Sequence, residues 1–99
     1  MSLTRHRYKI SGIVQGVGFR PFVYRTAQKC GLAGWVRNTP AGVEIEVQGS
    51  NAGLANFDIL LTSELPPLAV ISSHHCEEIP LGQDDGFSIL SSAGGDPAI

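Results

Sequence analysis

Residues 6–31 read HRYKISGIVQGVGFRPFVYRTAQKCG, and the first half of this passage predicts a strand followed by a loop. Over residues 6–12 the side chains alternate, with Tyr8 and Ile10 lying between the polar residues Arg7, Lys9 and Ser11, as in a strand that buries one face. Residues 15–18 break this alternation with two glycines that are separated by one residue. Glycine permits backbone conformations that other residues avoid, so we expect a tight loop here.

The second half of the same passage predicts a helix. Its apolar residues recur at spacings of three and four, which places them along one face of a helix. These residues are Phe19, Phe22, Val23, Ala27 and Cys30. Pro21 suits the first turn, where its missing N–H costs no hydrogen bond. Gly31 suits the C-terminal cap, so the helix is expected to end just before it.

The rest of the chain predicts strand, strand, helix and strand. The predicted elements are a hairpin of strands at 35–38 and 43–48, a helix capped by Ser50 or Asn51, a strand within 68–79 and a short edge strand at 87–90. The whole order is βαββαβ, that of a ferredoxin-like α+β sandwich. We therefore expect an antiparallel sheet with two helices on one face, built from residues 1–91. Residues 92–99 are expected to form a flexible tail or the start of an interdomain linker.

The composition describes one small domain. The chain has 99 residues, of which 42% are hydrophobic, enough for a core of its own. No run approaches the roughly 18 apolar residues of a membrane span, and the N-terminus lacks an apolar secretion segment. Cys30 and Cys76 form no CxxC motif. We expect a cytoplasmic domain with free thiols and no membrane partner.

The charges are divided between the two halves of the chain. All seven Lys and Arg residues precede residue 38, whereas all nine Asp and Glu residues follow residue 43. Two interpretations are open: the folded surface intermixes the halves, or the basic half builds an anion site. The net charge of −2 disfavours a nucleic acid as partner, because domains that bind a phosphate backbone carry a basic face.

The glycine loop opens directly into the first helix, and this junction carries the candidate site. Gly16 and Gly18 allow backbone N–H groups to face inward, and a helix N-terminus adds positive partial charge. Arg20 can grip a phosphoryl group with two parallel hydrogen bonds. A Walker A loop is excluded because its lysine is missing, and a dinucleotide fingerprint because its third glycine is missing. Local spacing alone leaves an ordinary tight turn and a phosphate site as equal alternatives.

Two motifs resemble the signatures of the acylphosphatase family. Residues 12–20, GIVQGVGFR, resemble G-x-V-Q-G-V-x-F-R, and residues 31–38, GLAGWVRN, resemble G-L-x-G-W-V-x-N. The resemblance extends from Tyr8 to Leu90, which is most of the chain. It implies the ferredoxin-like fold and an enzyme that hydrolyses acyl phosphates.

A second resemblance is narrower. The run RPFVY at residues 20–24 and the run ELPPLA at residues 64–69 are similar to the N-terminal domain of HypF, the family of carbamoyltransferases that mature [NiFe] hydrogenases. This implies carbamoyl phosphate as the substrate and further domains downstream in the same chain. A free-standing acylphosphatase is the alternative. An alternative of another class is a non-catalytic ferredoxin-like module that binds RNA or another ligand.

The family resemblance also implies the roles of individual residues. Arg20 binds the phosphoryl group, and Asn38 orients the attacking water. The phosphate is held in addition by the loop amides of Gln15, Gly16, Val17, Gly18 and Phe19. We expect no cofactor and no metal. In a strand, His74 and Cys76 share a face while His75 points away, which leaves too few ligands for zinc.

Overall fold

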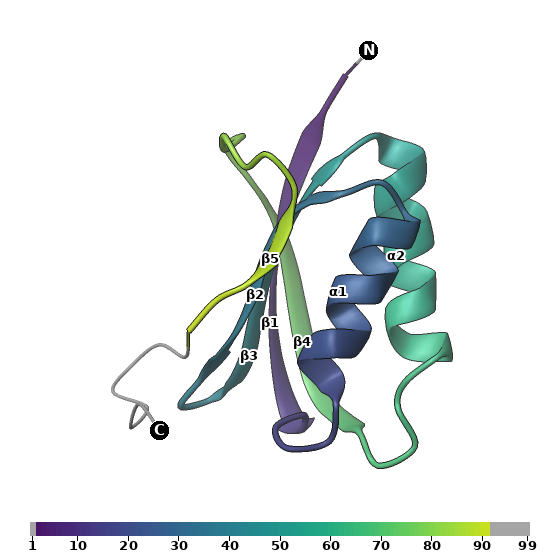
Figure 1. Cartoon of the computed structure of the whole chain (residues 1–99), viewed down its shortest axis with the longest axis vertical. Helices are drawn as coiled ribbons and strands as arrows, with labels where there is room; N and C mark the ends of the chain where they lie inside the picture. Colours follow the sequence, from purple (N-terminus) through teal and green to yellow (C-terminus); the bar gives the residue numbers. More distant parts are fainter. Residues whose placement is uncertain (1, 92–99) are drawn as a thin grey trace.

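The computed structural model describes residues 2–91, which form a five-stranded sheet with two helices on one face (Figure 1). The elements are β1 (Thr4–Ile13), α1 (Phe19–Lys29), β2 (Ala33–Thr39), β3 (Gly42–Gly49), α2 (Asn51–Ser63), β4 (Val70–Ile79) and β5 (Phe87–Ile89). The predicted order βαββαβ and the short final strand are confirmed. The tail predicted at residues 92–99 lies outside the described residues. Within residues 2–91, neither helix reaches the length and hydropathy of a membrane-crossing segment.

The strands lie side by side in the order β4-β1-β3-β2-β5. β1 pairs antiparallel with β3 and β4, and β2 pairs antiparallel with β3. The predicted antiparallel pairing holds for these four strands, but β5 pairs parallel with β2. After β4 the chain passes to the opposite edge of the sheet and reverses its direction, so β5 runs along β2. The sheet is therefore mixed and not wholly antiparallel.

The two predicted helix caps are present. Gly31 follows α1 with a φ of 71°, and the N–H of Leu32 donates to the carbonyl oxygen of Ala27 at 2.9 Å, which closes the end of the helix. At the start of α2 the hydroxyl of Ser50 accepts a hydrogen bond from the N–H of Gly53 at 3.1 Å. Of the two predicted cap residues, Ser50 is the one that acts.

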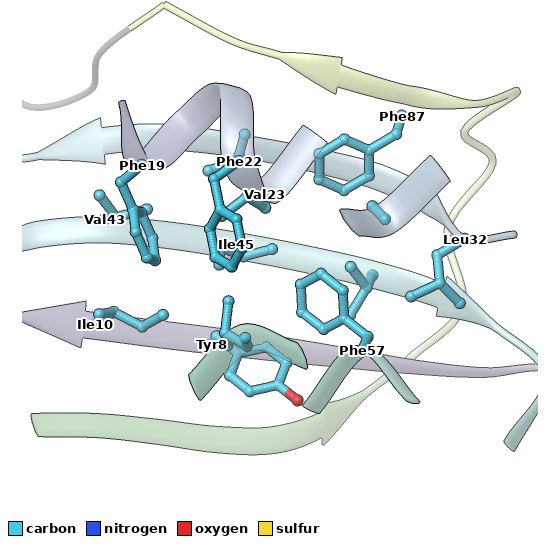
Figure 2. Close-up of a cluster of buried hydrophobic side chains, with 14 of the residues drawn as sticks. Tyr8, Ile10, Phe19, Phe22, Val23, Leu32, Val43, Ile45, Phe57 and Phe87 are labelled. Atoms are coloured by element: carbon cyan, nitrogen blue, oxygen red, sulfur yellow. The ribbon is translucent and has the colours of Figure 1, made fainter. Parts of the chain in front are cut away.

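The core lies between the sheet and the helices (Figure 2). α1 buries the stripe that its spacing predicts, apart from Cys30, which is half-buried just after the helix. α2 packs Phe57 edge-on against the ring of Tyr8 in β1, with ring centroids 5.6 Å apart. Phe19, the first residue of α1, is fully buried in this core. Its burial fixes the start of α1, and with it the preceding loop, against the sheet.

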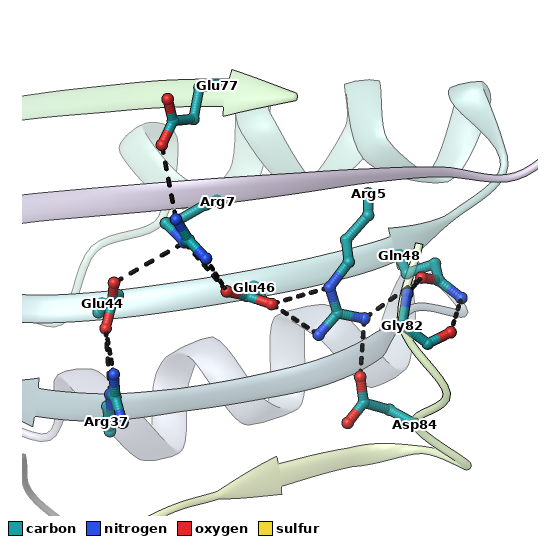
Figure 3. A network of polar contacts seen from close by, with 9 residues as sticks. All are labelled: Arg5, Arg7, Arg37, Glu44, Glu46, Gln48, Glu77, Gly82 and Asp84. Atoms are coloured by element: carbon teal, nitrogen blue, oxygen red, sulfur yellow. Dashed lines mark hydrogen bonds and ion pairs between the residues drawn. The ribbon is translucent and has the colours of Figure 1, made fainter. Parts of the chain in front are cut away.

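The sheet face away from the helices carries a network of ion pairs (Figure 3). Glu46 of β3 accepts from both Arg5 and Arg7 of β1, each at 2.8 Å. Arg37 of β2 pairs with Glu44 of β3 at 2.7 Å. The basic strand β1 and the acidic strand β3 are antiparallel neighbours, so the fold intermixes the two charged halves of the chain. For these three arginines, intermixing is the correct interpretation of the charge pattern.

Arg5 is the buried centre of this network, and replacing it by methionine is expected to destabilise the fold. Its side chain is 5% exposed and also pairs with Asp84, in the connection between β4 and β5, at 2.7 Å. The substitution removes one of the two cations that neutralise the buried carboxylate of Glu46. The free energy of unfolding should fall by about 2–3 kcal/mol, measured by urea or thermal unfolding.

Arg25→Met is the matched control for Arg5→Met. Arg25 is exposed on α1 and has no ion pair within residues 2–91. Its substitution should change the free energy of unfolding by less than about 0.5 kcal/mol. Equal losses in the two variants would show that the buried network adds nothing to stability.

Candidate functional site

The loop between β1 and α1 lies at the end of the sheet away from the N-terminus of the chain (Figure 1). Gly16 and Gly18 have φ values of 73° and 80°, in the left-handed region that glycine adopts without strain. A Cβ atom at either position would meet no atom of the described residues within 4 Å, so the backbone angle, and not lack of space, demands glycine. The two glycines turn the chain from the strand into the helix, as the sequence predicts.

The N-terminus of α1 is left open by this loop. Gly18 is the N-cap residue, no side chain of residues 2–91 caps the helix, and its first turn holds no acidic residue. Within residues 2–91, none of the backbone N–H groups of residues 15–20 has a hydrogen-bond partner, and the first bonded one is that of Phe22. These N–H groups and the positive end of the helix dipole lie together. Such a place favours an anion.

Arg20 lies in the first turn of α1, directly after the loop. It is half-buried. Arg5, Arg7 and Arg37 are neutralised by carboxylates, whereas Arg20 has no such partner among residues 2–91. Arg20 therefore brings a positive charge that no described carboxylate neutralises to the first turn of α1, and a guanidinium can form paired hydrogen bonds with an oxyanion.

Asn38 lies near the end of β2, two residues after the fully buried Val36, so its side chain is on the helix-facing side of the sheet. Its Oδ1 atom is buried and has no hydrogen-bond partner within residues 2–91. A buried acceptor without a donor is costly and is rare in folded proteins. Asn38 therefore offers a preformed acceptor that no other described group uses.

Gln15 joins the loop to the hairpin of β2 and β3. Its side-chain Nε2 donates to the carbonyl oxygens of Thr39 and Gly42, each at 2.8 Å. Thr39 directly follows Asn38 in β2, so the loop lies beside the strand end that carries Asn38. No hydrogen bond joins Arg20 to Asn38 in the described part of the chain, and the two are connected through this contact of the loop.

The side-chain role of Gln15 is missed by the sequence analysis, which assigns only its backbone amide to the site. The two acceptors of Gln15 lie 24 and 27 residues further along the chain. Local patterns of glycine, charge and apolar spacing carry no information on a contact of that range.

Two hollows flank the turn between β2 and β3. The smaller has a volume of about 400 Å³ and lies between this turn and the loop, with Gln15 and Pro40 in its lining. The larger, of about 580 Å³, is lined from β1, β3 and β4 and shares Pro40 with the smaller one. Arg20 and Asn38 line neither hollow. The candidate site is therefore defined by its N–H groups, its cation and its buried acceptor, and not by either of these two hollows.

The cysteines and the neighbouring histidine lie in other parts of the fold. His74 and Cys76 share one side of β4, opposite Ile10 and Tyr8 of β1. Burial raises the pKa of both Cys30 and Cys76, so both thiols are protonated at neutral pH. Among residues 2–91, no cluster of three or more His, Cys, Asp or Glu side chains is placed to hold a metal ion.

Comparison with known proteins identifies the family. The sequence model of the family Acylphosphatase matches residues 6–89. The carbamoyltransferase HypF2 of Cupriavidus necator is 51% identical over 96 residues, which cover 96% of this chain and 12% of that protein. An acylphosphatase of Caldivirga maquilingensis is 46% identical over 88 residues, which cover 86% of this chain and 92% of that enzyme. Full-length HypF, crystallised in a phosphate- and nucleotide-bound form, has a TM-score of 0.90 and 37% identity, covering 95% of this chain and 13% of that one.

The matched region contains the whole loop of residues 15–20 and Asn38. The chain spans about 12% of the length of its HypF relatives, so it is similar to one region of those longer proteins. It spans nearly the whole of the free-standing acylphosphatase. The chain is thus an acylphosphatase-like domain, like the N-terminal one of HypF, and it belongs to the acylphosphatase family.

Proposed function

We propose that this domain hydrolyses acyl phosphates, with carbamoyl phosphate as its substrate, as part of a longer carbamoyltransferase of the HypF type. The products are carbamate and inorganic phosphate. The carbamate would pass to further domains of the same protein. Two similarities support this reading: HypF2 is a carbamoyltransferase, and full-length HypF has been crystallised in a form that includes phosphate.

The observation that carries the proposal is the open helix start. Within residues 2–91, the N–H groups of residues 15–20 are unbonded and Arg20 has no carboxylate partner, which supports a site for a phosphoryl group here. Donors that are already oriented stabilise a dianion more strongly than a neutral ligand, because they need no reorganisation when the charge is bound. In this proposal, the loop amides of residues 15–19 and the guanidinium of Arg20 bind the phosphoryl oxygens.

The reaction needs little else from the protein. An acyl phosphate is a mixed anhydride, so its carboxylate is already a good leaving group. Water attacks phosphorus, the bond between phosphorus and the acyl oxygen breaks, and the proton of the water passes to the solvent. Catalysis is then a matter of binding the charge and aligning the water. The buried Oδ1 of Asn38 can accept a hydrogen bond from that water and direct its lone pair towards phosphorus.

Phosphate release from three substrates tests the proposed function. We expect the domain to hydrolyse carbamoyl phosphate and acetyl phosphate but not p-nitrophenyl phosphate, a phosphomonoester whose cleavage needs more than positioning. Carbamoyl phosphate decomposes in water, so the rate without protein is subtracted. Hydrolysis of acetyl phosphate alone would favour the alternative of a general acylphosphatase. No hydrolysis of any acyl phosphate would favour the non-catalytic binding module and overturn the proposal.

A further inference from the structure

We infer that Gln15 is a positioning residue, whose side chain holds the loop at a fixed distance from Asn38. The inference rests on the proposed function, because it concerns how the two parts of that site are kept together. It starts from the two hydrogen bonds of 2.8 Å that Nε2 donates to the carbonyl oxygens of Thr39 and Gly42.

The side chain of Gln15 is not free to bind phosphate. A glutamine amide has two N–H donors, and both are used on these carbonyl oxygens. The group that remains is the carbonyl oxygen Oε1, which only accepts hydrogen bonds and would repel a phosphate. The backbone N–H of Gln15 can therefore bind a phosphate, whereas its side chain binds the hairpin of β2 and β3.

The two acceptors are the ends of the turn between β2 and β3. Thr39 and Gly42 are register partners across the hairpin, and one amide group bridges both. The hydroxyl of Thr39 also accepts from the N–H of Ala41 at 3.2 Å, which closes the turn from inside. The side chain of Gln15 thus hydrogen-bonds to both ends of this turn. Asn38 is the residue of β2 that directly precedes Thr39, one of these two ends.

Between its two ends, the loop contacts the rest of the protein through Val17, which is partly buried against the core, and through the side chain of Gln15. Gly16 and Gly18 have open space around them and no side chain to pack. On either side, Val14 and Phe19 are buried in the core and hold the ends of the loop. Among residues 2–91, the side chain of Gln15 is the group of this loop that hydrogen-bonds to the hairpin of β2 and β3.

This arrangement predicts that loss of the Gln15 side chain lowers kcat but leaves the affinity for phosphate nearly unchanged. The loop would hold the phosphoryl group and Asn38 the water, so their separation sets the line of attack on phosphorus. A displacement of about 1 Å can cost about 100-fold in rate. Gln15→Ala should therefore lower kcat by about 10- to 100-fold. The inhibition constant of inorganic phosphate should stay within about threefold, because the loop amides and Arg20 remain.

Two further variants separate positioning from folding. Gln15→Glu keeps the shape of the side chain but cannot donate to two carbonyl oxygens when ionised, so it should be as slow as Gln15→Ala. Gln28→Ala is the matched control, since Gln28 is exposed on α1 and its Nε2 donates to the hydroxyl of Tyr24 at 3.0 Å. It should keep the rate of the unmodified domain. If Gln15→Glu is as fast as the unmodified domain, the two hydrogen bonds do not matter and the inference is wrong.

A double-mutant cycle with Asn38→Ala gives the sharpest test. If Gln15 acts by placing the loop relative to Asn38, its removal should cost nothing more once Asn38 is gone. We expect kcat of the double variant to equal that of Asn38→Ala within about twofold. If the fold-losses in kcat of the two single variants multiply in the double variant, Gln15 acts through a group other than Asn38. That outcome overturns the inference.

A measurement that needs no turnover keeps this inference distinct from the proposed function. Inorganic phosphate added to the ¹⁵N-labelled domain should shift the side-chain amide resonance of Asn38, and Gln15→Ala should reduce that shift by at least about half. An unmodified domain that hydrolyses nothing would overturn the proposed function alone. An Asn38 shift that is unchanged in Gln15→Ala would overturn the positioning role alone.

Discussion

Replacing Arg20 by alanine is expected to lower kcat/KM for acyl phosphates by at least about 1,000-fold, the range found when an arginine that stabilises a transferring phosphoryl group is lost. Arg20 carries the charge at the open helix start that no carboxylate neutralises within residues 2–91. The guanidinium binds phosphoryl oxygens in the ground state and in the transition state. Binding and chemistry should therefore weaken together, with a higher inhibition constant for inorganic phosphate.

The control for Arg20 is Arg25→Ala, the same change five residues further along α1 at an exposed position. It should leave kcat/KM within about twofold, because a distant surface charge acts only through a screened field. Arg20→Lys keeps the charge but cannot form the two parallel hydrogen bonds of a planar guanidinium. It should therefore recover only a minor part of the kcat/KM that Arg20→Ala loses. Steady-state kinetics with acetyl phosphate measure all three variants. Full activity in Arg20→Ala would show that another group binds the phosphate.

Asn38→Ala is expected to lower kcat by about 100-fold or more, the loss seen when one preorganised polar group is removed from a site. Asn38 contacts the water in the proposed mechanism and not the charge of the substrate. The inhibition constant of inorganic phosphate should therefore stay within about threefold of its normal value, in contrast to Arg20→Ala. An inhibition constant that rises as steeply as in Arg20→Ala would make Asn38 a phosphate ligand instead.

Stability gives a second measurement on the same variant. The buried Oδ1 of Asn38 has no donor within residues 2–91, so removing it relieves a desolvation cost. Thermal unfolding of Asn38→Ala should show no loss of stability and a gain of up to about 1 kcal/mol. Asn56→Ala, at an exposed position of α2, is the matched control and should leave kcat unchanged. A clear loss of stability in Asn38→Ala would mean that the amide is a structural group.

Much of the candidate site could be predicted from a short passage of sequence. The glycines at 16 and 18 predict a loop with positive φ, and both glycines have it. The helix predicted to follow begins at Phe19, which places Arg20 in its first turn. Whether the cation at that place was free could not be predicted, because it depends on carboxylates from distant strands. Only the family resemblance indicated a functional role for Asn38. From local sequence alone, an asparagine at a strand end is ordinarily interpreted as a turn residue.

The amino-acid sequence by itself determined the elements and their order, since apolar spacing, glycine conformation and helix caps are properties of neighbouring residues. The tertiary structure decided which residues of those elements pair, contact one another or are buried. It set β5 parallel to β2, neutralised Arg5 while leaving Arg20 without a carboxylate among residues 2–91, and buried the Oδ1 of Asn38. It also joined Gln15 to carbonyl oxygens 24 and 27 residues away. Each of these depends on groups that only the folded chain brings together, because no local pattern encodes the pairing of distant residues.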